Sequence, residues 1–279
     1  MSCLHKGGGA ASRIMLARST RQRLGDVQDG ASGVQAGGTE SGSNGGVGLL
    51  DEKVLYLVFK SMNWNPFLIC QYTLVCKRFA DVMKKVIWKE FCLSRAPKMV
   101  SHLLSGAGGQ GGTIAGGWQP LGKLMFSCPG SHQSKHFYSK TIPGHFVWKS
   151  RFSRTSGKSF LPIQCRSDTL YISDCCEHLD NGDDDDLGVY RGVFRAFGTS
   201  KTRRLLIENR VDLEETEFCP FCREKVWSMT GAQLVPPSAI QRLGAYKDNV
   251  DYFVCVNGHL HGMASLISTS DSELSGEDQ

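Results

Sequence analysis

The sequence predicts an α+β protein in which a small three-helix unit precedes a mixed α/β C-terminal domain. Three observations predict this class. Three short apolar stripes with helical spacing follow one another within residues 48–92, and short apolar runs alternate with turn residues within residues 118–267. Residues 1–47 are rich in Gly and Ser and contain few large apolar side chains, so we expect a disordered tail there.

The three-helix unit is predicted from its apolar periodicity and from one helix start. Asn65 followed by Pro66 is typical of a helix N-cap and of the first helical position. A unit of this size with so much apolar surface is marginal alone, so we expect a partner to stabilise it. The stripes on either side of this start are Val54, Leu55, Val58, Phe59 and Met62, and Phe79, Val82, Met83 and Val86.

The unit, with its run from Leu74 to Phe79 and its later Trp88, resembles the F-box. Through this motif, substrate receptors dock onto Skp1-type adaptors of cullin ubiquitin ligases. Leu50 stands where the motif usually has proline. The alternative is an ordinary helical-bundle segment. The resemblance implies adaptor-binding residues at Leu49, Leu50, Val54, Leu55, Val58, Phe59, Leu74, Val75, Cys76, Phe79 and Trp88.

Glycine-rich and acidic stretches flank the C-terminal domain. Residues 93–117 are predicted to be a Gly-rich linker. Gly106, Gly108 and Gly111 in it match the spacing of a dinucleotide-binding loop, but no strand precedes them and no amphipathic helix follows, so we expect no phosphate site. Residues 268–279 are predicted to be a frayed acidic tail.

Composition limits the class of protein further. No apolar run approaches about eighteen residues, so no transmembrane helix is expected. The N-terminus lacks the apolar core of a secretory signal, which favours an intracellular protein. Its eleven cysteines are then thiols, metal ligands or buried apolar residues rather than disulfides. A net charge of +5 neither requires nor excludes a nucleic-acid partner. The tail's Arg13, Arg18, Arg21 and Arg23 could help nuclear import or could simply be solvated.

Within residues 118–267 the pattern predicts strands, two helices and many turns. A helix over Ala239–Leu243 should end at Gly244. A second helix stripe, Val189 to Phe197, should leave Arg191 and Arg195 facing solvent. The expected strands are Leu170–Ile172, Lys225–Trp227 and Tyr252–Val254.

The cysteines and histidines of this domain predict a structural zinc site. Cys219 and Cys222 form a Cys-x-x-Cys turn, and Cys255 with His259 supplies a second knuckle, which together give four tetrahedral ligands. His261 would lie behind His259 or replace it. A site filled by four protein ligands has no open position for catalysis. The alternatives are a redox pair at Cys219 and Cys222, or buried thiols without metal.

A weaker set of residues could form a second zinc site. It comprises Cys128, His132, one of the adjacent cysteines 175 and 176 (Cys176 in our assignment), and His178. Its spacings are irregular, and the alternative is a set of buried thiols and surface histidines.

The chain as a whole resembles the plant EID1-like F-box proteins, which are linked to phytochrome A signalling. The resemblance covers most of residues 49–266 and implies a nuclear substrate receptor in light or hormone signalling. The residues that carry it are Cys128–His132, Arg151–Ser153, Ser156–Phe160, Cys176–His178, Cys219–Cys222 and Val254–His259.

These features lead to three functional hypotheses. The favoured one is the substrate-recognition subunit of a Skp1–cullin–F-box ligase, without catalytic residues of its own, in which residues 118–267 bind the target. A RING-like ligase would need eight ordered zinc ligands, and the sequence contains only one convincing set of four. The alternative is a zinc-dependent nucleic-acid binder with a basic face formed by Arg191, Arg195, Lys201, Arg203 and Arg204.

Overall fold

The computed structural model describes residues 52–106, 113–130, 144–156, 160–178 and 186–267, all within one compact unit. Within these ranges, no helix is both long enough and apolar enough to cross a membrane. Several predictions concern residues outside the ranges, namely the N-terminal tail, Leu49, Leu50, His132 and the acidic C-terminal tail.

The first described part of the chain is helical, as its apolar stripes predict, but residues 52–95 form four α-helices where three were predicted. α2 begins where predicted, because the Asn65 side chain accepts hydrogen bonds from the backbone N–H groups of Phe67 and Leu68 at 3.0 and 3.4 Å. One π-helical turn, η1, joins α3 to α4. The bounds are α1 Glu52–Ser61, α2 Pro66–Thr73, α3 Lys77–Val82, η1 Met83–Ile87 and α4 Trp88–Arg95.

A further helix, α5, spans Pro97–Gly106, inside the range predicted to be a Gly-rich linker. The prediction was wrong for this segment. Met99, Val100 and Leu103 are buried, and their spacing places them on one side of the helix. Their packing outweighs the proximity of a glycine-rich stretch, which begins only at the end of α5.

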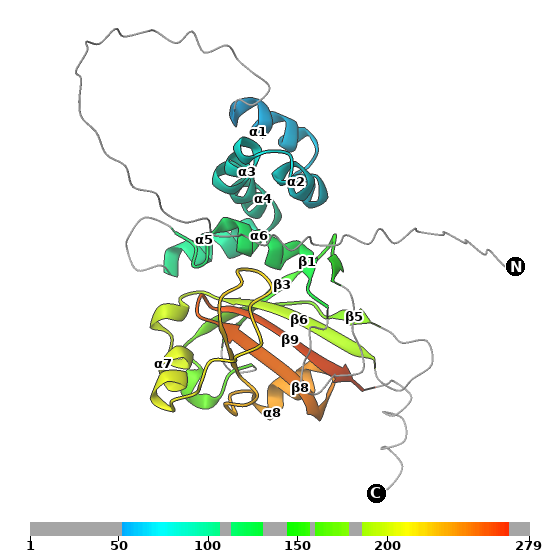
Figure 1. Cartoon of the computed structure of the whole chain (residues 1–279). Coiled ribbons are helices and arrows are strands. Elements are labelled where there is room, and N and C mark those ends of the chain that lie inside the picture. Colours follow the sequence, from blue (N-terminus) through cyan, green and yellow to red (C-terminus); the bar gives the residue numbers. More distant parts are fainter. Residues whose placement is uncertain (1–51, 107–112, 131–143, 157–159, 179–185, 268–279) are drawn as a thin grey trace, which may run out of the picture. The chain divides into compact units, whose positions relative to one another are not determined.

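The C-terminal part is a mixed α/β domain, as predicted, and it is built on one antiparallel sheet. This seven-stranded sheet has the order β3-β4-β6-β9-β8-β7, with β5 paired to β6, and β1 and β2 form a separate two-stranded sheet (Figure 1). The bounds are α6 Trp118–Phe126, β1 Ser127–Cys128, β2 His145–Phe146, β3 Phe152–Ser156, η2 Ile163–Cys165, β4 Thr169–Ser173, β5 Cys176–His178, β6 Leu187–Phe194, η3 Phe197–Thr199, α7 Lys201–Glu208, β7 Val226–Ser228, α8 Pro237–Leu243, β8 Ala245–Cys255 and β9 His259–Leu266.

Most predicted elements of this domain are confirmed, but one helix is in fact a strand. The strand predictions fall in β4, β7 and β8, and α8 ends at Gly244, whose φ of 63° is left-handed. The helix predicted from Val189 to Phe197 is wrong, because β6 occupies most of it and every residue of β6 is buried. A strand covered on both faces has no alternating polar residues, so its apolar run resembles a buried helix.

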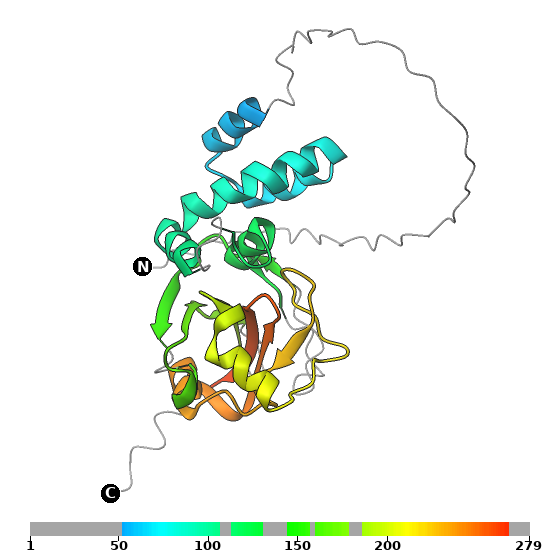
Figure 2. The same ribbon diagram turned by 90° about the vertical axis from the view of Figure 1, so that its left-hand side faces the viewer.

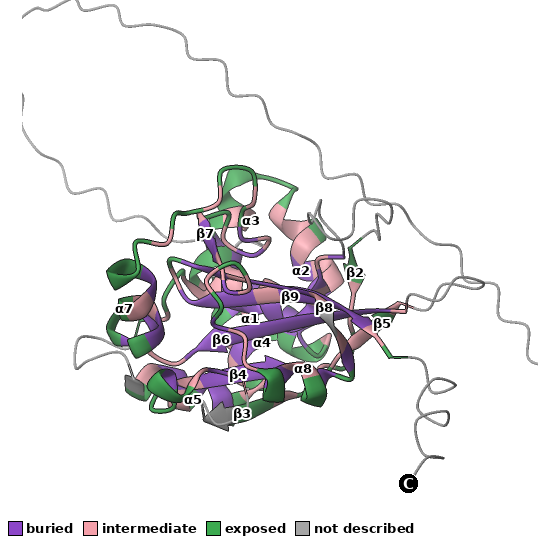
Figure 3. Ribbon diagram, turned by 90° about the horizontal axis from the view of Figure 1, so that it is seen from below, coloured by how far each residue is buried: buried purple, intermediate pink, exposed green. Residues whose placement is uncertain are grey.

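Helices α7 and α8 pack against one face of the sheet (Figure 2). Leu206 of α7 and Leu243 of α8 share one hydrophobic cluster with Phe194 of β6 and Val254 of β8. Figure 3 shows β6 and β9 as buried, whereas α7 and α8 also have exposed residues. The sheet therefore forms the interior of the domain.

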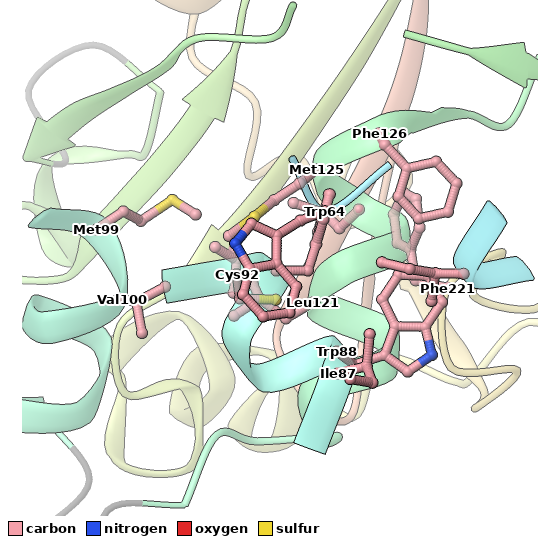
Figure 4. Packing of buried hydrophobic residues seen from close by; sticks show 14 of the residues in the cluster. Trp64, Ile87, Trp88, Cys92, Met99, Val100, Leu121, Met125, Phe126 and Phe221 are labelled. Carbon is pink, nitrogen blue, oxygen red and sulfur yellow. The ribbon is translucent and has the colours of Figure 1, made fainter. Parts of the chain in front are cut away.

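A second cluster connects the N-terminal helices to the domain, and we call it the junction cluster. Trp88 is 1% exposed, and its ring stacks on Phe126 of α6 at 5.6 Å between centroids (Figure 4). Gly122 makes this possible, since a Cβ there would lie 2.5 Å from Cε3 of Trp88. The junction cluster includes Leu55, Phe59, Trp88, Phe91, Leu121, Phe126, Tyr171, Val193, Cys219, Phe221 and Cys255.

Candidate metal centres

The structure brings together the four predicted zinc ligands. The ligand atoms of Cys219, Cys222, Cys255 and His259 all lie within 4.8 Å of one another, and we call this group the Cys219 centre. Its donors come from two turns that are 33 residues apart in the chain, and the sheet carries one of these turns at the β8–β9 connection. The predicted spacing and the observed geometry agree.

The first turn is held by backbone hydrogen bonds around Cys219. Its N–H donates to the carbonyl of Glu224 at 2.9 Å, and the N–H of Arg223 donates to the carbonyl of Cys219 at 2.8 Å. Arg223 has a φ of 65°, a left-handed conformation that reverses the chain after Cys222. Both thiols of the Cys-x-x-Cys turn thereby face the same point.

The second turn needs a glycine at position 258. Gly258 has a φ of 81°, and a Cβ there would lie 2.4 Å from Cβ of Phe197. The tight turn lets the N–H of His259 donate to the sulfur of Cys255 at 3.3 Å. Such an N–H···S contact stabilises the thiolate form, which is the form that binds metal.

His259 presents Nδ1 to the cysteines and is completely buried. Nδ1 lies 3.5 Å from Sγ of Cys255 and 3.9 Å from Sγ of Cys219. Gly116, just before α6, packs closely against the ring, since a Cβ there would be 2.7 Å from Cε1 of His259. His261, the other candidate, is not in the group and stacks on Phe253 instead, at 5.3 Å.

The three thiols of the Cys219 centre differ in their pKa values. Hydrogen bonds from Cys219 and Cys255 lower the pKa of Cys222 strongly. Hydrogen bonds to Cys222 and Cys255, together with burial, raise the pKa of Cys219. The pKa of Cys255 is raised to about 12, because the contact with Cys222 and burial outweigh the lowering effect of Cys219. A dication would allow all three to ionise together, as thiolate ligands require.

A second cysteine–histidine group lies at the junction of the two sheets. Cys128, His145, Cys176 and His178 have ligand atoms within 4.8 Å of one another, and we call this group the Cys128 centre. Sγ of Cys128 is 3.3 Å from Nε2 of His178, and Sγ of Cys176 is 3.4 Å from Nε2 of His145. Cys175 is not in the group. His132, which the sequence favoured, lies outside the described residues.

His145 was missed by the sequence-based prediction for a structural reason. Seventeen positions separate it from Cys128, a distance that matches no common knuckle. The two residues meet because they are directly paired across the β1–β2 ladder. Cys176 and His178 are two apart on β5, so their side chains project from the same side of that strand.

The predicted adaptor-binding residues fall into an exposed group and a buried group. Leu74 is 84% exposed, Val75 is 64% exposed, and Val58 and Cys76 are also exposed. Leu57, which was not predicted, is exposed as well. Val54 and Phe79 are half-buried. Leu55, Phe59 and Trp88 are buried in the junction cluster.

The five basic residues proposed for a nucleic-acid face do not share one surface. Arg191 is 1% exposed and donates to the carbonyls of Leu124 and Ser127 at 2.8 and 3.3 Å. Arg195 donates to the carbonyl of His102 at 3.2 Å. Arg191 was predicted to face solvent because β6 was assigned as an amphipathic helix. Its burial removes the centre of the predicted basic face.

Comparison with known proteins agrees with the sequence resemblance. The family model described as the C-terminal domain of EID1-like F-box protein 2 matches residues 133–265. EID1-like F-box protein 2 of Arabidopsis thaliana is 50% identical over 233 residues, covering 83% of this chain and 92% of the relative. EID1-like F-box protein 1 of the same plant is 50% identical over 81% of this chain and 76% of its own.

EID1-like F-box protein 3 of the same plant is 48% identical over 238 residues, covering 85% of this chain and 87% of the relative. No solved structure matches the chain. Identity at this level extends through both the N-terminal helices and the cysteine–histidine domain. The chain therefore belongs to the family of EID1-like F-box proteins.

Proposed function

We propose that this protein is the substrate-recognition subunit of a Skp1–cullin–F-box ubiquitin ligase. In this role it binds a Skp1-like adaptor, and through it a cullin, and it holds a target protein for ubiquitination and proteasomal degradation. The chemistry of ubiquitin transfer belongs to the other subunits, so the chain acts as a non-catalytic adaptor. The observation that carries the proposal is the uncovered apolar surface of its N-terminal helices in a chain of the F-box family.

The uncovered apolar side chains lie on α1 and on the turn between α2 and α3. Leu57 and Val58 are 62% and 38% exposed on α1, and Leu74 and Val75 are 84% and 64% exposed at the turn. Leu55 and Phe59 of α1 are buried at the same time. The helices therefore bury one set of apolar side chains and leave another in water, which is typical of a protein interaction site.

The C-terminal domain is proposed to bind the target, with zinc as a structural cofactor at the Cys219 centre. Three thiols and one imidazole are a common ligand set for structural zinc, and all four positions are filled by protein. The metal would hold the Cys219–Cys222 turn against the β8–β9 turn. The family relationship supports a target in plant light or hormone signalling, and a nuclear location is proposed with it.

Adaptor binding tests the proposal directly. We expect the full chain to bind a Skp1-type adaptor and the double variant Leu74→Asp, Val75→Asp to bind at least about tenfold more weakly, since about 1.4 kcal/mol is a factor of ten. Burying carboxylates in an apolar interface is costly. The dissociation constants can be measured by biolayer interferometry.

The matched control is Ile163→Asp, a similar substitution at a side chain that is 71% exposed on the C-terminal domain. This variant should bind the adaptor like the unmodified chain. Equal binding by all three proteins, or no binding by the unmodified chain, would overturn the proposed function.

A further inference from the structure

We propose that the Cys128 centre binds a second zinc ion, with His145 as its fourth ligand. This ion would link the β1–β2 sheet to β5 of the main sheet. The inference concerns the chain's own architecture and does not depend on its role in ubiquitination. It differs from the sequence-based ligand set by replacing His132 with His145.

The four side chains converge from two separate sheets. The β1–β2 ladder contributes Cys128 and His145, and β5 contributes Cys176 and His178. Each sulfur lies next to an Nε2 atom of a histidine from the other sheet, at 3.3 and 3.4 Å. The two imidazole rings lie 5.1 Å apart at an interplanar angle of 71°. This places two sulfurs and two nitrogens around a common point, as a tetrahedral zinc ion requires.

Arg191 places a positive charge beside the Cys128 centre. Arg191 is fully buried nearby, where burial lowers its pKa and the negative charges of Cys128, Cys176 and Asp174 raise it. Its hydrogen bonds go to backbone carbonyls and to the Ser150 hydroxyl, so a carboxylate does not neutralise it directly. A fixed guanidinium beside the two cysteines is compatible with negatively charged thiolate ligands at this centre.

A disulfide and a catalytic thiol account for the geometry less well than a metal. A Cys128–Cys176 disulfide would use only the sulfurs and would leave two histidines directed at them without a function. A catalytic cysteine needs one histidine and access for a substrate, whereas Cys128 is completely buried. Two thiolates also balance the charge of Zn²⁺, so that the four-ligand centre would be neutral.

The metal would stabilise a part of the fold that has few contacts of its own. β1 and β2 contain two residues each, and β5 pairs with β6 over three residues. Ladders this short are marginal in water. Cys128 lies two positions after the end of α6, the helix on which Trp88 packs. A zinc ion here would therefore fix the C-terminal end of α6 to the sheet, in addition to the hydrogen bonds from Arg191.

Zinc stoichiometry of the full chain tests the proposal. We expect two equivalents of zinc by elemental mass spectrometry and one equivalent in His145→Ala. His132→Ala is the matched control, because it removes the histidine that the sequence favoured, and it should keep two equivalents. One equivalent in the unmodified chain would overturn the proposal, as would retention of two equivalents by His145→Ala or loss of one by His132→Ala.

Two further measurements separate loss of a ligand from loss of folding. His145→Cys replaces one zinc ligand by another and should restore two equivalents, whereas a structural role of the imidazole alone predicts no rescue. With cobalt in place of zinc, Cys219→Ser should retain the thiolate charge-transfer bands of a two-sulfur site, and His145→Ala those of a three-sulfur site.

A Cys128–Cys176 disulfide in the purified chain, detected by non-reducing peptide mass spectrometry, would contradict the proposal.

Discussion

Trp88 illustrates at the residue scale how one side chain can match a docking motif and yet belong to the core. The F-box resemblance placed it among the adaptor-binding residues, but its ring is buried against Phe126 and Gly122. Leu74 and Val75 of the same motif are exposed. Their substitution should affect binding, whereas substitution of Trp88 should first affect stability.

The contact between Gly122 and Trp88 can be tested by adding a side chain. Gly122→Val should lower the free energy of unfolding by about 1–3 kcal/mol, because its Cβ would lie 2.5 Å from Cε3 of Trp88. Urea denaturation measures the change. Gly198→Val is the control, since a Cβ there has no neighbouring atom within 4 Å. Equal stability of both variants would show that the packing is looser than described.

The two turns of the Cys219 centre differ at the element scale in how much regular structure holds them. The first turn is closed by an isolated bridge between Phe218 and Lys225, and the second is the tight connection between β8 and β9. Cys219 and Phe221 of the first turn and Cys255 of the second turn are buried in the junction cluster. The metal ion that we propose would add a direct link between the two turns, as in other small metal-stabilised elements.

Removal of the metal should loosen these turns before the rest of the domain. We expect a strong chelator to increase amide hydrogen exchange in residues 219–225 and 255–259, because the thiolates repel one another once the dication is gone. Helix α8 contains none of the eight proposed metal ligands and serves as the internal control. Unchanged exchange in the two turns after complete zinc removal would contradict a structural role of the metal.

The N-terminal helices and the C-terminal domain share a core at the scale of the whole molecule. The junction cluster contains Leu55 and Phe59 of α1 together with Val193 of β6 and Cys255 of β8. A helical unit of this size gains stability from such a shared core. For a ligase subunit, it would also limit the motion of the bound target relative to the adaptor.

A variant in the helices should therefore destabilise the sheet. Trp88→Ala should cost about 3–5 kcal/mol, as truncation of a buried tryptophan does, and should speed hydrogen exchange in β6 and β9 as well as in α4. Leu74→Ala, at a side chain that is 84% exposed, is the control and should change neither region. Faster exchange confined to the helices would show that the two parts unfold independently.

The sequence by itself determined the features that depend on local spacing. Helical stripes and the Asn65 cap predicted α1, α2 and α3, Gly244 predicted the end of α8, and the Cys-x-x-Cys turn with the Cys255–His259 knuckle predicted the Cys219 centre. Each of these depends on residues within a few positions of one another, where backbone geometry fixes the relation.

Only the tertiary structure decided the features that depend on which residues meet across the fold. Strand pairing brings His145 opposite Cys128. The apolar run around Arg191 forms a strand that is buried on both faces, where its spacing predicted a helix. The same packing removed Trp88 from the predicted docking surface. Periodicity in a sequence shows that a side chain is buried, but the partner that buries it is set by contacts between distant segments.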